Sequence, residues 1–540
     1  VDIAAALLRR GDVRLLLMCT ARPELVAQEP TWAGATAGSL MITLPPLRDA
    51  EVATMYTHLL GQALFPADSL GPLVELADGN PLYAHEYTRM LVEHGALRME
   101  QPLAIGSTVP MPDSVQAVIA NRVDLLDPSD RAVLQAASVV GVQFWPGAVA
   151  AALGRSTEVV ERSLRRLEQR DLVHEQLTSI MEGQPEYRFG HILVRDVCYQ
   201  RLPRVERIAR HKRTASWLDS VAGDRDTGLA ETLAHHRVTA YEIARSLNLD
   251  ASRLAGAAMQ ALHRAAYRAC ALHAFDIAAT HAKRALTLCD ETTAAGDRLP
   301  LELLAVEIDF HADGETFLAT GGVDRLNALA RQLDTAGDLA CAARAWTLIG
   351  QAAWLRADRR GAVTFLRKAI ARYQDLPDSA EKADAFAEFG RLHMISYEHG
   401  PAIEAATTAA EIADRLGLAE ARANARITAS SARYTSGDAA GFTELREVAE
   451  ECRSRRLLAL PRAVRNLISI TCEEGDWPAT EALMAEEIEV ASGGNNLTSR
   501  YSKEATRAYF AGDWHRLVTV ADVVLTSPSG EWELQLRGLN

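Results

Sequence analysis

Residues 346–369 read WTLIGQAAWLRADRRGAVTFLRKA, and residues 386–409 repeat the same pattern in FAEFGRLHMISYEHGPAIEAATTA. In each unit, two amphipathic segments of helical period flank a short polar turn. Gly350 and Ala362, matched in the second unit by Gly390, are small enough for two antiparallel helices to approach closely, and large residues fill the gap between units. A repeat of this length indicates stacked helical hairpins.

The repeat continues through the C-terminal half of the chain. Similar turn punctuation recurs at Ala357-Asp358, Glu398-His399-Gly400, Gly437-Asp438, Gly475-Asp476 and Gly512-Asp513. The spaced helical positions resemble those of the tetratricopeptide repeat: Trp346, Ile349, Gly350, Ala353, Ala362, Leu366 and Ala369, then Phe386, Phe389, Gly390, His393, Ala402, Ala406 and Ala409. We therefore expect residues 206–540 to form an α-solenoid of tetratricopeptide-like repeats. The resemblance implies a protein or peptide partner on the repeat surface.

Composition narrows the function classes. The 540 residues are enough for several domains, and 48% of them are hydrophobic. With 57 basic and 71 acidic residues the formal charge is −14, which argues against wholesale binding to nucleic acid or to anionic membranes. Seven scattered cysteines, an odd number without a C-x-x-C pair, predict a reduced, cytoplasmic protein. No apolar run reaches the ~18 residues that span a bilayer, so we expect no membrane partner.

Residues 1–47 predict the end of an α/β domain. The run Arg14–Cys19 is apolar and of strand length, as in a parallel strand that is buried on both faces, and Thr20-Ala21-Arg22 follows it. A second apolar run, Leu40–Leu44, stops at Pro45-Pro46. Two such strands cannot form a stable sheet alone, so we expect them to be the last strands of a larger domain.

The next two segments are predicted to be a helical lid, residues 48–112, and a winged-helix domain, residues 113–205. In the lid, Gly79-Asn80-Pro81 separates two helices. The winged-helix pattern is three helices followed by a β-hairpin, and Asp127-Pro128-Ser129-Asp130 is predicted to cap the second helix. The expected helices and strands are 115–126, 132–140, 156–172, 172–174 and 187–189.

Three motifs in these segments carry a family resemblance. They are the strand ending in Thr20-Ala21-Arg22, then Gly79-Asn80-Pro81-Leu82, then Phe189-Gly190-His191-Ile192-Leu193-Val194-Arg195-Asp196. Together they resemble the second half of STAND-class (AAA/NB-ARC-like) bacterial signalling ATPases. The implied fold is mainly α: a remnant of a P-loop α/β domain, a helical lid, a winged helix and then the repeat solenoid.

The resemblance implies nucleotide-contacting roles for Arg22, Gly79, Pro81 and His191. Arg22 lies where ligands bind, past the carboxyl end of a strand, and its planar fork can bind phosphate. In the family, the proline of the Gly-x-Pro motif packs near the adenine, and the motif histidine reads the β-phosphate of ADP. Ile192 stands where that motif has an aspartate, which departs from the family pattern.

The phosphate-binding loop of these ATPases is absent from the sequence. No G-x-x-x-x-G-K-[ST] occurs, nor any Gly-Lys pair, so nothing cradles the β- and γ-phosphates. We expect the P-loop half to be missing, no catalytic residues and no metal ligands in this chain. ATP or ADP would be the cofactor of the intact protein, and this chain alone should not hydrolyse ATP.

Alternative interpretations remain open at the level of sequence. The chain is a purely repeat-based interaction scaffold if the first 200 residues are a degenerate remnant. Similar ATPase and repeat segments also occur in multidomain adenylate cyclases and in LuxR-type transcriptional regulators, although neither output domain is visible here. DNA binding through Arg162, Arg165, Arg166 and Arg170 is disfavoured, because acidic residues alternate with them as on a solvated helix.

Overall fold

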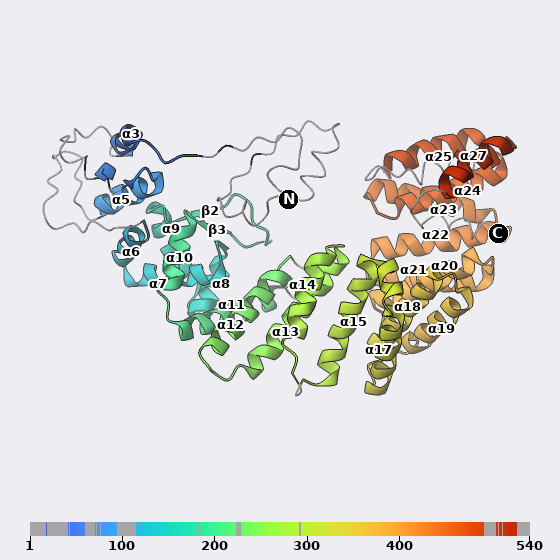
Figure 1. Ribbon diagram of the computed structural model, residues 1–540, viewed down its shortest axis with the longest axis horizontal. Helices are drawn as coiled ribbons and strands as arrows, with labels where there is room; N and C mark the ends of the chain where they lie inside the picture. Colours follow the sequence, from blue (N-terminus) through green and yellow to red (C-terminus); the bar gives the residue numbers. More distant parts are fainter. Residues whose placement is uncertain are drawn as a thin grey trace. The chain divides into compact units, whose positions relative to one another are not determined.

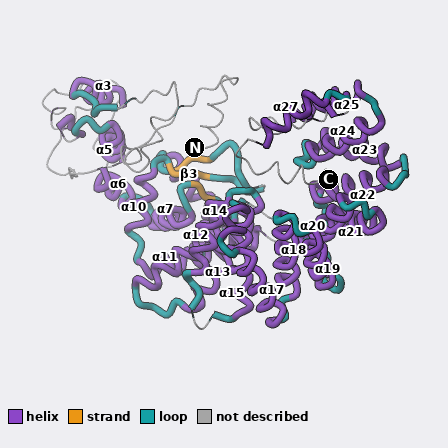
Figure 2. Tube along the Cα trace, turned by 45° about the vertical axis from the view of Figure 1, so that its right-hand side comes forward, coloured by secondary structure: helices purple, strands orange, loops and turns teal. Residues whose placement is uncertain are grey.

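The computed structural model describes the following residues: 44–59, 73–93, 115–222, 228–290, 293–490 and 504–525, except 76, 182, 506 and 510, together with 18, 42 and 71. The chain divides into two compact units, residues 1–217 and residues 218–540. Helices dominate both, and short strands occur in the first unit alone among the described residues (Figures 1 and 2).

The first unit begins with helices that form one small core. They are α3 (Asp49–Leu59), α5 (Pro81–Glu93) and α6 (Val115–Asp124). Tyr56, Tyr87 and Met90 are fully buried among them, and Val118 of α6 joins the same cluster. The predicted helical character of this segment is therefore confirmed for its described residues.

The rest of the first unit surrounds a three-stranded antiparallel sheet. Its elements are α7 (Pro128–Val140), β1 (Gln143–Phe144), α8 (Pro146–Leu153), α9 (Thr157–Gln169), β2 (Val173–Glu175), β3 (Tyr187–Phe189), α10 (Ile192–Gln200) and α11 (Arg204–Ala222). The strand order is β1-β3-β2, with Phe144 opposite Tyr187 and Val173 opposite Phe189. The stacked and tilted rings of Phe144, Tyr187 and Phe189 form the centre of this core.

The two strands predicted at 172–174 and 187–189 are confirmed as β2 and β3. Strand β1 and helix α8 are additions that the sequence pattern did not indicate. β1 is only two residues long, too short for a period of two to show. α8 begins with Pro146-Gly147, a dipeptide that by itself predicts a turn.

The predicted capping role of Asp127 is wrong in its detail. Asp127 is the N-terminal flanking residue of α7, but its side chain makes no capping hydrogen bond. Pro128, with its fixed φ and missing N–H, starts the helix instead. Asp130 lies in the first turn of α7 and pairs with Arg166 of α9. The Arg166 Nε donates to Asp130 Oδ2 at 2.9 Å.

The buried strands expected before residue 48 are not seen at the described positions. Met18 is 90% exposed and Leu44 is 84% exposed, and neither they nor Ile42 belongs to a strand. A parallel strand is buried only when neighbours cover both faces, and no described element covers these residues. The other residues of 1–43 lie outside the described part, so their assignment to a P-loop core remains a prediction.

The second unit is a run of helical hairpins. Its helices are α12 (Ala230–Ser246), α13 (Ser252–Ala271), α14 (Phe275–Leu286), α15 (Ala295–Ala312), α16 (Gly314–Ala319), α17 (Gly322–Ala336), α18 (Leu339–Leu355), α19 (Arg359–Tyr373), α20 (Ala380–Ile395), α21 (His399–Arg415), α22 (Ala419–Thr435), α23 (Ala440–Arg455), α24 (Leu460–Glu474), α25 (Trp477–Val490) and α27 (Trp514–Leu525). Successive helices pack against each other along the chain (Figure 1).

The residues predicted for close helix packing have that role. Gly350 lies where α18 meets α19, and Gly390 lies where α20 meets α21. A Cβ added to either glycine would lie 3.0 Å or less from the nearest atom of the facing helix. Ala362, Leu366 and Ala369 are fully buried in the first of these hairpins. The repeat pattern therefore identified the packing positions correctly.

The turns inside the hairpins share one backbone conformation. A left-handed residue occurs in each turn, at Ala357 (φ 59°), Tyr397 (φ 57°), Gly437 (φ 95°), Gly475 (φ 74°) and Gly512 (φ 71°). The next amide donates back into the last helical turn, as in the bond from Asp358 N to the Ala353 oxygen at 2.9 Å. This is the Schellman arrangement, in which glycine is preferred because it has no Cβ.

The first helices of the hairpins form the inner layer of the solenoid. α18 packs on α20, α20 on α22, and α22 on α24, whereas the described second helices α19, α21 and α23 show no comparable contact with one another. In a curved stack the layer with mutual contacts is the compressed, concave one. No described helix is long and apolar enough to cross a membrane.

Candidate functional site

Two of the four predicted nucleotide contacts lie at the start of α5. Gly79 has φ 67°, and a Cβ there would lie 2.6 Å from the Leu47 carbonyl oxygen, so only glycine fits without strain. The Leu47 N–H donates to the Gly79 oxygen at 2.9 Å. Pro81 is the first residue of α5, and the Asn80 side chain accepts from the Leu82 N–H at 3.0 Å. This motif is thus a rigid helix start.

His191 is the third described residue of the predicted set. It precedes α10, and its Nδ1 accepts a hydrogen bond from the Leu193 N–H at 3.1 Å. The ring therefore caps the helix. Because Nδ1 is the acceptor, the neutral ring carries its proton on Nε2, which is then a hydrogen-bond donor. Arg22, the fourth residue of the set, lies outside the described residues.

The segment before His191 packs on the turn between α9 and β2. The Gly190 N–H donates to the Leu172 oxygen at 3.0 Å, and a Cβ on Gly190 would lie 2.8 Å from the Asp171 oxygen. His174 Nε2 lies 3.1 Å from Asp171 Oδ1. Asp171 itself has φ 57°, a conformation that is uncommon outside glycine. The His191 motif thus lies against Asp171.

Helices α5 and α6 each reach the same turn through one arginine. Arg89 of α5 forms an ion pair with Asp171, and its Nη1 donates to the Arg170 oxygen at 3.2 Å. Arg122 of α6 donates to the same oxygen from Nη2 at 3.0 Å. We call Glu86, Arg89, Arg122, Arg170 and Asp171 the junction, because side chains and backbone from α5, α6 and the α9–β2 turn meet there.

The junction contains a buried charge pair. Arg122 is 1% exposed and forms an ion pair with Glu86 of α5. Burial opposes the ionisation of Glu86, but hydrogen bonds from His85 and Arg122 outweigh this effect and lower the pKa of Glu86 below its ordinary value. Breaking such a pair from one side leaves a charge uncompensated in the interior. The orientation of α5 on α6 therefore depends on both partners.

The structure joins the Pro81 helix and the His191 segment through residues that the motifs do not include. Arg89 and Gly190 both contact Asp171, from elements far apart in the sequence. Gly79, Pro81 and His191, the described residues of the predicted set, do not make this connection directly. Sequence analysis missed Arg89 and Arg122 because their junction partners are 36 to 82 residues away, beyond any local spacing rule.

The inner layer of the repeats contains a second polar network. Arg344 of α18 forms an ion pair with Glu307 of α15, and its guanidinium lies 5.0 Å from the ring centre of Tyr267 of α13. The Tyr267 hydroxyl donates to Glu381 Oε1 of α20 at 2.7 Å. Burial opposes the charge on Arg344, yet Glu307 keeps the pKa of Arg344 above its ordinary value. Four hairpins thus contribute to one set of side chains.

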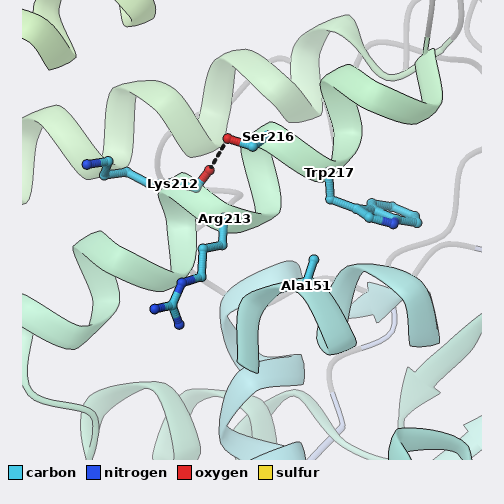
Figure 3. A pocket seen from close by; sticks show the side chains of 5 residues that line it. All are labelled: Ala151, Lys212, Arg213, Ser216 and Trp217. Atoms are coloured by element: carbon cyan, nitrogen blue, oxygen red, sulfur yellow. Dashed lines mark hydrogen bonds between the residues drawn. The ribbon is translucent and has the colours of Figure 1, made fainter. Parts of the chain in front are cut away.

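A surface depression of about 430 Å³ lies beside α8 and α11, lined by Ala151, Lys212, Arg213, Ser216 and Trp217. Its side chains do not converge on a common point. Figure 3 shows Lys212 and Arg213 pointing away from Trp217, while Ser216 donates to the Lys212 oxygen at 3.0 Å. The described residues include no group of three or more His, Cys, Asp or Glu side chains that could hold a metal ion.

No family model matches the sequence, and no curated protein matches it significantly. Among solved structures, the chain is similar to a STAND protein (signal transduction ATPase with numerous domains) with a tetratricopeptide repeat sensor from Pyrococcus horikoshii. That TM-score is 0.46 at 11% identity, over 93% of this chain and 75% of the other.

Two further structures show the same kind of likeness. A Rap protein complexed with competence and sporulation factor has a TM-score of 0.43 at 13% identity, over 62% of this chain and 89% of the other. Yeast Tom70 has a TM-score of 0.32 at 11% identity, over 89% and 96%. These scores are too low to support an argument about function, so the assignment of helical repeats rests on the chain's own hairpins.

Proposed function

We propose that the chain is a regulatory protein in which helical repeats bind a protein or peptide and the N-terminal unit senses a nucleotide. In this proposal, residues 1–47 are the remnant of a P-loop core and residues 48–112 are a lid. The third and fourth domains are a winged helix at 113–205 and the repeats at 206–540. ATP or ADP would contact Arg22, Gly79, Pro81 and His191, as the STAND resemblance implies.

The observation that carries this proposal is the junction at Asp171. A ligand that touches Pro81 at the start of α5 and His191 at the start of α10 touches two helices that both lead to Asp171. A ligand shifts a conformational equilibrium only by the difference in its affinity for the two states. Because α5 and the segment before α10 both contact Asp171, a change in one of them could alter the position of the other through this residue.

The chemistry of His191 supports a phosphate contact. Its Nδ1 is occupied by the Leu193 N–H, which leaves Nε2 as the donor. The N-terminus of α10 adds the partial positive charge of a helix start. A donor and a positive end together favour an anion. Ile192 cannot supply the carboxylate that the family motif has at this position.

The winged-helix proposal rests on element order. Helix α7, strand β1, helices α8 and α9 and the hairpin β2–β3 follow one another as in that fold. Arg166 of α9 is engaged with Asp130, and the Arg162 Nε donates to the Glu158 oxygen of its own helix at 3.3 Å. These contacts favour a relay between segments over a DNA-reading helix.

The experiment is isothermal titration of ADP into the purified chain and into His191→Ser. Serine supplies a hydroxyl oxygen that can accept from the Leu193 N–H in place of Nδ1, but its side chain does not reach as far as the imidazole. We expect wild-type binding in the micromolar range and at least a tenfold loss in the variant. His281→Ser, on α14 of the repeats, is the matched control and should bind as wild type.

Coupling is tested separately, by hydrogen exchange with and without ADP. Protection of α10 and of α5 should rise together in the wild type, and Arg89→Ala should separate the two responses. If ADP does not bind at all, the nucleotide role is refuted, and the chain is best described as a repeat scaffold with a degenerate remnant.

A further inference from the structure

The inner layer of the repeats contains one arginine that is held by neutral groups. Arg462 lies in the first turn of α24, and its Nη1 donates to the backbone oxygen of Asn424 at 2.7 Å and to Asn424 Oδ1 at 3.3 Å. Its Nη2 donates to Thr428 Oγ1 at 2.6 Å. All these acceptors belong to α22 and none is charged. Arg462 forms no ion pair with any described residue.

Several arginines of the repeats have carboxylate partners. Arg344 pairs with Glu307, Arg422 and Arg426 with Glu451, Arg433 with Glu444, and Arg453 with Glu486. Arg462 differs from these arginines in having neutral partners alone. This difference requires an explanation because a partly buried cation without a counter-charge is unfavourable.

The surroundings of Arg462 increase this cost. Burial is the main cause that lowers the pKa of Arg462 to about 10; the guanidinium groups of Arg391 and Arg465 act in the same direction, and Glu388 opposes them in part. An arginine does not lose its proton at neutral pH, so the cost is that of a charge kept in place. Arg391 is already bonded to Glu388 and Arg465 to Glu487, which leaves the positive charge of Arg462 without a partner.

The guanidinium keeps donors for a second set of acceptors. Nη1 and Nη2 are engaged with α22, but Nε–H has no acceptor among the described residues, and Nη2 has a second hydrogen to donate. Nε and Nη2 form one edge of the planar fork. That edge matches the two oxygens of a carboxylate at charge-assisted hydrogen-bond distance. The bonds to α22 hold the fork in place, so little side-chain entropy is lost on binding.

We propose that Arg462 binds the acidic side chain of a peptide that lies along the inner faces of α20, α22 and α24. The proposal rests on the peptide-binding role given above and specifies the chemistry of its ligand. Hairpin helices precede α24 along the chain, and α25 and α27 follow it. The site is therefore within the run of helices, where an internal Asp or Glu of an extended peptide can reach it.

The probe is a fluorescein-labelled hexaglutamate with an amidated C-terminus, measured by fluorescence anisotropy with the full chain at low salt. Hexaglutamine of the same length is the reference peptide. We expect hexaglutamate to bind at least tenfold more tightly than hexaglutamine, and the difference to shrink as salt is added. A second hexaglutamate with a free C-terminus distinguishes a terminal carboxylate from a side chain, and should bind no more than twofold tighter.

Three variants localise the effect. Arg462→Gln should weaken hexaglutamate binding at least tenfold. Arg367→Gln is the matched control, because it removes the same charge from an exposed position on the second helix α19. It should stay within twofold of wild type. Arg462→Lys keeps the charge without the planar fork and should give an intermediate loss. Circular dichroism checks that all variants remain helical.

Several results would overturn the inference. They are equal affinities of Arg462→Gln and Arg367→Gln, equal binding of hexaglutamate and hexaglutamine, or a requirement for the free C-terminus. A screen of displayed random peptides separates this failure from that of the proposed function. Recovery of neutral or basic peptides alone would refute the acidic ligand and leave peptide binding standing. Recovery of none, with no hexaglutamate binding, would refute both.

Discussion

Replacing Gly390 by alanine should destabilise the hairpin of α20 and α21, although alanine is the better helix former. Gly390 lies in the interior of α20, where α21 approaches closely. A Cβ at this position would lie 3.0 Å from the Ala406 nitrogen, 3.1 Å from the Ala402 oxygen and 3.3 Å from the Ala406 Cβ. All three neighbours belong to the backbone or are attached directly to it, so relief requires a shift of α21 itself.

The magnitude follows from two opposing effects. The change from glycine to alanine in a helix interior contributes about 1 kcal/mol of stability. Overpacking a close contact costs about 1–3 kcal/mol. We therefore expect a net loss of about 1 kcal/mol, with about 2 kcal/mol as the upper bound. At Gly350 the nearest atom belongs to the flexible Leu366 side chain, so the same change there should cost less.

Gly400 supplies the matched control. It lies in the first turn of α21, with nothing within 4 Å of an added Cβ. Gly400→Ala should gain up to about 1 kcal/mol, since only the propensity effect remains. The two variants should thus differ by about 2 kcal/mol, or roughly 30-fold in the local opening equilibrium.

The assay is native-state hydrogen exchange of peptides from α20 and α21, read by mass spectrometry. Local exchange is preferred to a global melting curve because solenoids unfold in parts. Faster exchange in Gly390→Ala and slower exchange in Gly400→Ala are expected. If Gly390→Ala exchanges as slowly as Gly400→Ala, the close approach of the two helices is not a constraint and the reasoning fails.

Three further outcomes are expected. Arg122→Leu leaves the buried Glu86 without its arginine partner and with His85 alone, so the first unit should lose about 3–5 kcal/mol. Combining it with Glu86→Met should restore much of this loss in thermal denaturation. Burial opposes the ionisation of Asp130, but Arg166 holds the pKa of Asp130 below its ordinary value. The ion pair with Arg166 therefore stabilises the folded state fully above the unfolded pKa of about 4. This stabilisation is lost as the pH falls through the folded pKa. Asp130→Asn should therefore flatten the acid side of the stability curve; an unchanged curve would exclude this pair as its cause. Ala357 has φ 59°, so Ala357→Gly should increase the free energy of unfolding by up to about 1 kcal/mol and raise the denaturant midpoint. A lower midpoint would contradict the assignment of strain to this turn.

The repeats could be predicted well because their determinants are local. Helical period, a small residue at each close approach and a recurring turn all occur within about 40 residues of sequence. The turns at Ala357 and Tyr397 have the same left-handed conformation as the glycine turns, because the flanking helices hold these residues in it. The strands β2 and β3 were also recognisable, since each is bounded by clear turn signals.

The candidate sites could be predicted only in part. Gly79 and Pro81 are identifiable because a left-handed glycine and a first-turn proline are properties of the chain itself. The capping role of His191 needed the structure, which shows which ring nitrogen is engaged. Strand β1 was missed because two residues carry no period, and its pairing with β3 depends on residues 43 positions away or more.

By itself, the sequence determined the helical repeats, the hairpin turns and the strands β2 and β3, because period and backbone preference act between near neighbours. Only the tertiary structure decided which charges meet. Arg122 pairs with Glu86, which is 36 residues away in the sequence, and Tyr267 bonds to Glu381, which is 114 residues away. Arg462 donates instead to neutral groups of α22. An ion pair or an unpaired cation depends on distance and burial in space, and neither is encoded in a local pattern.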